Sequence, residues 1–133
     1  MPEIILSTEI LAQIAQYNIM LGATVTNNSD LKRIYDNDCI SFLSIEPLLE
    51  ELNCETFFSR QPHYDGDDVK KYDWMIIGAE TGKRKNKVVP KPEWIEQIVK
   101  ECRTWDIPIF MKKSIKPYWD RELITEFPWV KKF

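Results

Sequence analysis

One apolar run constrains the fold of this chain more than any other stretch. Residues 74–79 read Trp-Met-Ile-Ile-Gly-Ala, follow Asp73 and lead directly into Glu80. An uninterrupted apolar run of this length, bounded by polar residues, predicts a strand buried in a parallel sheet. A second apolar segment, residues 40–45, ends in the same way at Glu46. Because α/β proteins bind ligands at the carboxyl ends of their parallel strands, the two glutamates mark the expected site.

Strand and helix patterns alternate along the rest of the chain. Strand composition recurs in three further segments: residues 3–6, 19–25 and 107–111. Between the strands, apolar residues at helical spacing predict helices over residues 9–18, about 30–35 and 93–105, and a helical turn near 48–52. Ser7 or Thr8 suits the first cap, Ser29 or Asp30 the second, and Pro92 the start of the third helix. This alternation predicts a parallel sheet with right-handed crossovers.

The two faces of the predicted sheet differ in composition. Side chains alternate between the faces of a strand, so counting back by twos from each strand end assigns every residue to a face. One face collects small, polar and some aromatic residues: Gly22, Thr24, Phe42, Ser44, Ile76, Gly78 and Phe110, followed by Glu46, Glu80 and Lys112. The other face is apolar: Leu43, Ile45, Met75, Ile77, Ile109 and Met111. This difference is typical of a barrel wall, with helices packed outside the apolar face.

Length and composition predict one soluble domain over residues 1–133. The chain has 133 residues, of which 44% are hydrophobic and 29% charged, as in ordinary globular proteins. Residues 55–71 hold Pro62, Gly66 and several aspartates, so a long exposed loop is expected there. Aromatic residues recur near the end of the chain and predict a packed cover rather than a disordered tail: Tyr118, Trp119, Phe127, Trp129 and Phe133.

Charge and hydropathy exclude some classes of function. No apolar run approaches the roughly 20 residues that a membrane helix needs, and no signal-peptide pattern is present, so a cytoplasmic protein is expected. The net charge of −3 argues against a nucleic-acid-binding protein. The basic loop with Lys83, Arg84, Lys85 and Lys87 nevertheless leaves anion contact open as an alternative to a solvated surface.

The candidate chemical groups do not form a complete catalytic set. Cys39, Cys54 and Cys102 are odd in number and far apart, which indicates reduced, mostly buried thiols rather than disulfides or a zinc site. His63 is the only histidine and lies in a polar stretch, where a surface role is expected. No nucleophile lies beside a base in the sequence, so it leaves open whether the chain is an enzyme.

Four blocks of sequence, taken in order, resemble a known family. The blocks are residues 18–25 (Asn-Ile-Met-Leu-Gly-Ala-Thr-Val), 42–49 (Phe-Leu-Ser-Ile-Glu-Pro-Leu-Leu), 73–82 (Asp-Trp-Met-Ile-Ile-Gly-Ala-Glu-Thr-Gly) and 107–112 (Ile-Pro-Ile-Phe-Met-Lys). Together they resemble the phage-associated radical-SAM-like family of unknown function, and the match covers nearly the whole chain. The family has glycine where this chain has Ala79, and a Gln-Trp-Gly where this chain has Lys113-Ser114.

The resemblance implies a fold, a cofactor and a missing part. It implies an α/β fold, a partial (β/α) barrel of about four to five parallel strands with outer helices. It also implies S-adenosylmethionine as a cofactor, beside an iron–sulfur cluster held by a cysteine triad. That triad is missing here, and the three cysteines present are too far apart to replace it. The chain is therefore expected to match the carboxyl-terminal part of the family domain, and an iron–sulfur cluster is expected only if a partner supplies the cysteines.

Two principal hypotheses follow, and a third, weaker one is a nucleic-acid protein that uses Lys83, Arg84, Lys85 and Lys87 with nearby aromatic residues. In the first, the chain is a radical-SAM-like portion that is not catalytic alone and holds a cofactor or ligand through five residues at the barrel mouth: Thr24, Glu46, Glu80, Thr81 and Lys112. Two unpaired strand edges would then favour a homodimer or a separate amino-terminal half-domain as partner. In the second, the chain is a non-catalytic module of phage or mobile-element origin that binds a ligand or a protein. A structural alternative for the glutamates is pairing with Lys112 or capping of nearby loops.

Overall fold

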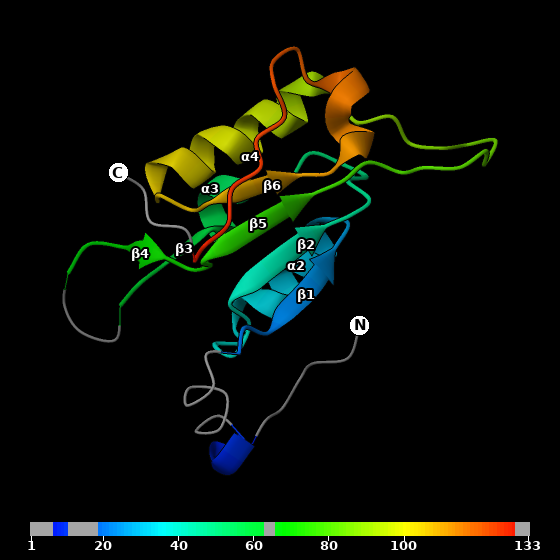
Figure 1. The fold of residues 1–133 in the computed structure, drawn as a ribbon. Helices are drawn as coiled ribbons and strands as arrows, with labels where there is room; N and C mark the ends of the chain where they lie inside the picture. The colour runs from blue at the N-terminus through cyan, green and yellow to red at the C-terminus, as the bar shows by residue number, and fades with distance from the viewer. Residues whose placement is uncertain (1–6, 11–18, 63–65, 130–133) are drawn as a thin grey trace.

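The computed structural model describes residues 7–10, 19–62 and 66–129 of the chain. Its centre is a four-stranded parallel sheet formed by β1 (Gly22–Val25), β2 (Phe42–Ile45), β5 (Trp74–Ile77) and β6 (Ile109–Met111). Helices pack against this sheet (Figure 1). The structure thus confirms the predicted α/β fold, with four parallel strands among the described residues.

The strands are arranged side by side in the order in which they occur in the chain. The sheet order is β1-β2-β5-β6, and every neighbouring pair is parallel. The register places Thr24 opposite Ser44, Ser44 opposite Ile76, and Ile76 opposite Phe110. A doubly wound sheet reverses its strand order at a switch point, whereas this sheet does not. The strands of a (β/α) barrel also follow chain order, so the observed order is compatible with the expected partial barrel.

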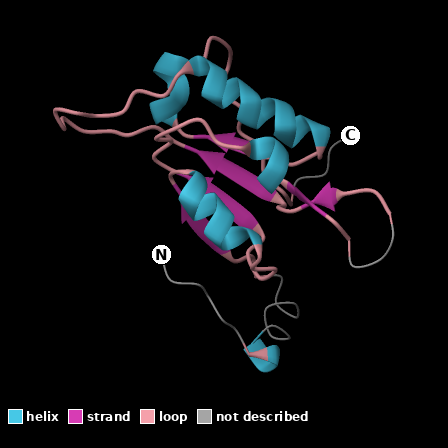
Figure 2. Cartoon of the chain, turned by 180° about the vertical axis from the view of Figure 1, so that it is seen from behind, coloured by secondary structure: helices cyan, strands magenta, loops and turns pink. Residues whose placement is uncertain are grey.

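The helices lie on one face of the sheet. Figure 2 shows α2 (Asn28–Tyr35), α3 (Cys54–Phe57) and α4 (Pro92–Thr104) on the same side of the strands. The strand residues beneath them are at most 5% exposed: Ala23, Val25, Leu43, Ile45, Met75, Ile77, Ile109 and Met111. The predicted apolar face is thus the buried one. We call it the covered face, and the opposite side of the sheet the open face.

Two helix starts can be compared with their predicted caps. Asn27 caps α2, because its side chain accepts a hydrogen bond from the Asp30 backbone N–H at 2.9 Å. The prediction of Ser29 or Asp30 is therefore wrong by two or three residues. Ser7 Oγ accepts a hydrogen bond from Ile10 N–H at 3.2 Å, which agrees with a cap at this residue. The predicted strand at 3–6 and most of the predicted helix at 9–18 lie outside the described residues.

The segment after β2 differs from the prediction. Residues 46–53 form a loop rather than a helical turn, and helix begins only at Cys54. The segment expected as a loop at about 55–71 carries most of α3 and a small antiparallel hairpin of β3 (Ser59–Arg60) and β4 (Val69–Lys70). Its anchors are apolar: Phe58 is fully buried, and the Phe57 ring packs edge-on against Tyr35 at 5.4 Å.

The carboxyl-terminal part of the chain closes one edge of the sheet. After β6, the chain forms the 3-10 helix η1 (Lys113–Tyr118) and then returns along β6. Met111 N–H donates to Ile124 O, and Glu126 N–H donates to Ile109 O, both at 2.7 Å. The prediction of two unpaired edges is therefore wrong for β6. Among the helices that the structure describes, none has the length and apolar character to cross a bilayer.

Candidate functional site

The carboxyl ends of the four strands meet at one end of the sheet. The loops that leave them begin with Thr26, Glu46, Gly78 and Lys112. The covered face is filled by apolar side chains, so a ligand at this end has access only from the open face. The predicted site residues can therefore be compared by whether they lie at this end of the open face.

Glu46 and Lys112 form an ion pair across the end of β5. The Lys112 ammonium contacts Glu46 Oε2, and the two side chains are 45% and 33% exposed, respectively. Gly78 lies beneath the Glu46 side chain: a Cβ atom at position 78 would stand 2.9 Å from Glu46 Cγ. A glycine is therefore needed here to let the carboxylate pass over the strand. The structure brings these two predicted site residues together, and their pairing is also what the structural alternative for Glu46 expects.

Glu80 forms its hydrogen bonds within its own loop. Its carboxylate accepts hydrogen bonds from Arg84 Nε at 2.5 Å, from Arg84 Nη2 at 2.9 Å and from Val88 N–H at 3.0 Å. The Arg84 hydrogen bonds, followed by that of Val88, lower the pKa of Glu80 to about 2. Glu80 thus ties both ends of the loop at residues 81–87, as the loop-capping alternative expects.

The two threonines of the predicted site are exposed. Thr24 stands on β1 with its side chain on the open face, opposite Ser44 of β2. Thr81 lies in the loop beyond Glu80. Within the described part of the chain, neither side chain has a hydrogen bond to Glu46 or Lys112. The roles of all five residues in ligand binding stay predictions.

An aromatic cluster covers the other half of the open face, toward the amino ends of the strands. Trp74 is its centre, with ring centroids of four neighbours at 5.6 to 6.5 Å: Phe42, Phe110, Phe127 and Trp129. The indole N–H of Trp74 donates to Glu126 O at 2.9 Å. The expected aromatic cover thus exists for Phe127 and Trp129, while Phe133 lies outside the described residues. Only the carboxyl-end half of the face remains for a polar ligand.

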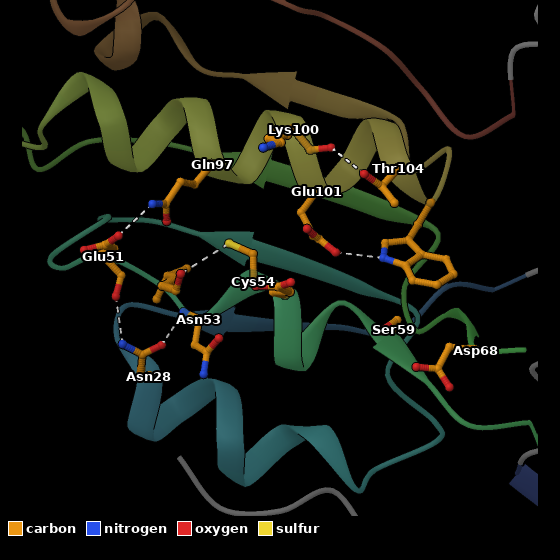
Figure 3. Close-up of a pocket in the computed structure, with 13 residues that line it drawn as sticks. Asn28, Glu51, Asn53, Cys54, Ser59, Asp68, Gln97, Lys100, Glu101 and Thr104 are labelled. Carbon is orange, nitrogen blue, oxygen red and sulfur yellow. Dashed lines mark hydrogen bonds between the residues drawn. The ribbon is translucent and has the colours of Figure 1, made fainter.

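A second hollow lies on the helix side, between α2, α3 and α4. This groove has a volume of about 910 Å³ and is lined by polar residues (Figure 3). Two of its four acidic side chains have hydrogen-bond partners: Glu51 accepts from Gln97 Nε2 at 2.7 Å, and Glu101 accepts from the Trp105 indole N–H at 2.9 Å. Asn28 Nδ2 donates to Glu51 O at 2.8 Å, which ties α2 to the loop before α3. These polar contacts thus join α2, α4 and the loop before α3 across the groove, which the sequence had not indicated.

Comparison with protein families shows to which family the chain belongs. A family model described as "Protein of unknown function (DUF5131)" matches residues 3–122. The chain belongs to this family. No match was found for it among curated proteins or among solved structures. Residues 3–122 include all four strands of the sheet, so the family match and the fold refer to the same unit.

The cysteines of this DUF5131 protein do not fit an iron–sulfur cluster. Cys54 of α3 and Cys102 of α4 are buried, and burial raises the pKa of Cys54 to about 12 and that of Cys102 well above its ordinary value. Cluster iron needs thiolates that converge on one point. Among the described residues, no group of three cysteine, histidine or acidic side chains is placed to hold a metal ion. The described chain therefore offers no resident site for such a cluster.

Proposed function

We propose that the carboxyl-end half of the open face is one wall of a small-molecule site, which a further segment or a partner chain completes. The observation that carries the proposal is the Glu46–Lys112 pair on a face of a parallel sheet that no described helix covers. Parallel sheets normally have both faces covered, so an open face implies a missing layer. An exposed ion pair gains little from its own contact, and a charged ligand can exchange with it at low cost.

The ligand class follows from the charges of the pair. A zwitterionic amino-acid group presents a carboxylate, which Lys112 can bind, and an ammonium group, which Glu46 can bind. S-adenosylmethionine, the cofactor that the radical-SAM-like resemblance implies, carries such a group, so Glu46 and Lys112 fit its amino-acid end. Bound there, it would supply an activated carbon on a sulfonium. Thr24 and Ser44 offer hydroxyl groups on the same face.

Radical chemistry has no support from this chain alone. The described cysteines do not fit a cluster, so a cluster must come from outside the described residues if one is used. We therefore propose binding and orientation as the role of this chain, in a single domain that acts in the cytoplasm. The three free cysteines agree with a reducing compartment.

Calorimetric titration with S-adenosylmethionine tests the proposal. Lys112→Gln and Glu46→Gln should each weaken binding roughly tenfold, as expected for the loss of one charge-assisted hydrogen bond of about 1.5 kcal/mol. Arg121→Gln is the matched control, because it removes another exposed cation that pairs with a glutamate, Glu96. Absence of binding by the unmodified protein, or equal weakening by the control, would overturn the assignment.

The second candidate is a non-catalytic protein-binding module of phage or mobile-element origin. The observation that favours it is the aromatic cluster, in which Trp129 is 67% exposed although it packs on Trp74 and Phe127. Exposed tryptophans are typical of protein interfaces. Light scattering at increasing protein concentration tests it: Trp129→Ala should shift a dimer toward monomer. A monomer at every concentration argues against self-association.

A further inference from the structure

Basic side chains concentrate at the carboxyl ends of β5 and β6. Residues 80–91 and 112–118 carry eight of the 18 lysines and arginines in the chain: Lys83, Arg84, Lys85, Lys87, Lys91, Lys112, Lys113 and Lys116. The only acidic residue in these two segments is Glu80. The excess of acidic groups that makes the whole chain negative therefore lies elsewhere in the sequence.

The fold holds the two basic segments next to each other. Ala79 N–H donates to Ser114 Oγ at 3.0 Å, which joins the start of the loop after β5 to η1. Lys112 N–H donates to Ile77 O at 2.9 Å, which joins the ends of β6 and β5. Figure 1 shows the loop after β5 projecting past the end of the sheet, with η1 beside its base. The two segments thus form one surface.

Five lysines of this surface form no ion pair in the described part of the chain, although Lys87 acts on Glu80 at longer range and helps to lower the pKa of that carboxylate. Arg84 is held by Glu80, Lys112 by Glu46, and Lys91 lies over the Trp94 ring. In the part of the chain that the structure describes, no ion pair involves the remaining five, which we call the lysine end: Lys83, Lys85, Lys87, Lys113 and Lys116. Four of them are exposed, and Lys87 is half-buried. Positive charges on one surface repel one another, so an anion that binds here relieves that repulsion.

We propose that the lysine end binds the phosphate backbone of a nucleic acid. The lysine ammonium is a compact point charge that suits phosphate oxygens. Backbone contacts of this kind carry no base readout, so binding should be independent of sequence. A protein partner would need an apolar anchor at the centre of its contact, but Val89 is the one large exposed hydrophobic residue described in these segments. The composition of these two segments therefore favours a nucleic acid, with its uniformly charged backbone, over a protein as the partner.

The acidic net charge does not prevent this contact. Screening reduces the effect of exposed charges beyond about 8 Å at physiological ionic strength. A phosphate at the lysine end interacts mainly with the local positive charges, while more distant carboxylates are screened. The net charge of −3 is thus a poor guide to what this surface binds. The inference also stands apart from the proposed small-molecule site, because Glu46 and Lys112 are not part of the lysine end.

Fluorescence anisotropy with a labelled single-stranded DNA of about 20 nucleotides tests the proposal at salt concentrations from about 50 to 200 mM. Counterion release predicts that each lost phosphate contact reduces affinity about fivefold at about 0.1 M salt and makes the salt slope shallower by about 0.7. The double variants Lys83→Gln/Lys85→Gln and Lys113→Gln/Lys116→Gln should therefore each weaken binding about 25-fold.

The control removes the same charge elsewhere. Lys32→Gln/Lys100→Gln changes two exposed lysines of α2 and α4 that have no ion pair in the described structure. It should leave the affinity within about twofold. Equal weakening by the control would mean that total charge matters rather than the lysine end, and would overturn the proposal. Absence of binding at low salt, or equally tight binding of ATP at the same lysines, would overturn it too. Lysine-to-glutamine changes on the surface should not unfold the chain, which circular dichroism verifies.

Discussion

The covered and open faces of the sheet use neighbouring residues in different ways. On β5, Met75 and Ile77 are fully buried under the helices, while Trp74 and Ile76 face the other side and are only partly covered. The covered face is apolar from end to end. The open face changes along its length from an aromatic cluster to a polar strand end.

This difference separates the face of the sheet that stabilises the fold from the face that is proposed to bind a ligand. Burial of apolar surface drives folding, so the covered face must contribute most of the stability. The carboxyl-end half of the open face contributes less and is free to carry charge. Under the proposed function, folding and ligand binding would depend on alternate residues of the same strands.

The largest expected effect comes from two isoleucines that follow each other on β5. Ile77→Ala should lose roughly 3 kcal/mol of unfolding free energy, because truncation leaves a cavity in a packed core. Ile76→Ala removes the same atoms from the open face and should lose less than about half of that. Urea denaturation measures both. Equal losses would show that the two faces are equally buried in solution.

A methyl group added at Gly22 should disrupt the packing of the aromatic cluster on the open face. The Phe42 ring lies directly over Gly22, so a Cβ atom there would occupy the space of the ring. Gly22→Ala should cost about 1–3 kcal/mol through overpacking. The double variant Gly22→Ala/Phe42→Val should recover part of this loss in the same denaturation assay. No recovery would locate the strain outside this contact.

The strand end can be examined through the pH dependence of Glu80. Its folded-state pKa is lowered to about 2, whereas an unfolded glutamate titrates near about 4.3. The stabilising contribution of Glu80 is therefore complete above the unfolded value and disappears as pH falls toward 2. The difference in stability between the unmodified protein and Glu80→Gln should shrink over that range. A difference that stays constant with pH would contradict the Arg84 and Val88 contacts.

The smallest effect is expected at Tyr72, which is fully buried. Its hydroxyl is the one buried side-chain polar atom of the described residues that has no hydrogen-bond partner, and burial raises the pKa of Tyr72 above its usual range. Tyr72→Phe removes a group that gains nothing from its surroundings. Thermal unfolding should show a change within about 0.5 kcal/mol, or a small gain. A clear loss would mean that the hydroxyl has a partner in solution.

The sequence predicted the sheet well because its signals are local. Apolar runs and alternation located all four strands and assigned Leu43, Met75 and Ile109 to the covered face, since period-two patterning depends only on neighbouring residues. The prediction failed after β2. The spacing of Leu48 and Leu52 is typical of a helix, but both side chains pack into the core from a loop. Tertiary packing there overrides helical spacing.

The candidate site was predicted in part. Glu46 and Lys112 meet because parallel strand ends share one edge, a rule that the sequence alone can use. The contacts of Glu80 were harder to predict. Its partner, Arg84, lies four residues later in the chain, in a loop whose shape no sequence pattern revealed. The lysine end was visible as charge, but the contacts that hold its second segment beside the first, such as the Ala79–Ser114 hydrogen bond, appear only in the structure.

Because residues 124–126 pair with β6, the two edges of the described sheet differ in their ability to associate with another chain. With that edge occupied, β1 is the one end strand of the described sheet to which another strand can add. Two copies that met through β1 would be related by a two-fold axis, and neither would keep a second edge for a third copy. Association by this route is thus self-limiting, and it ends at a pair instead of growing into a fibre.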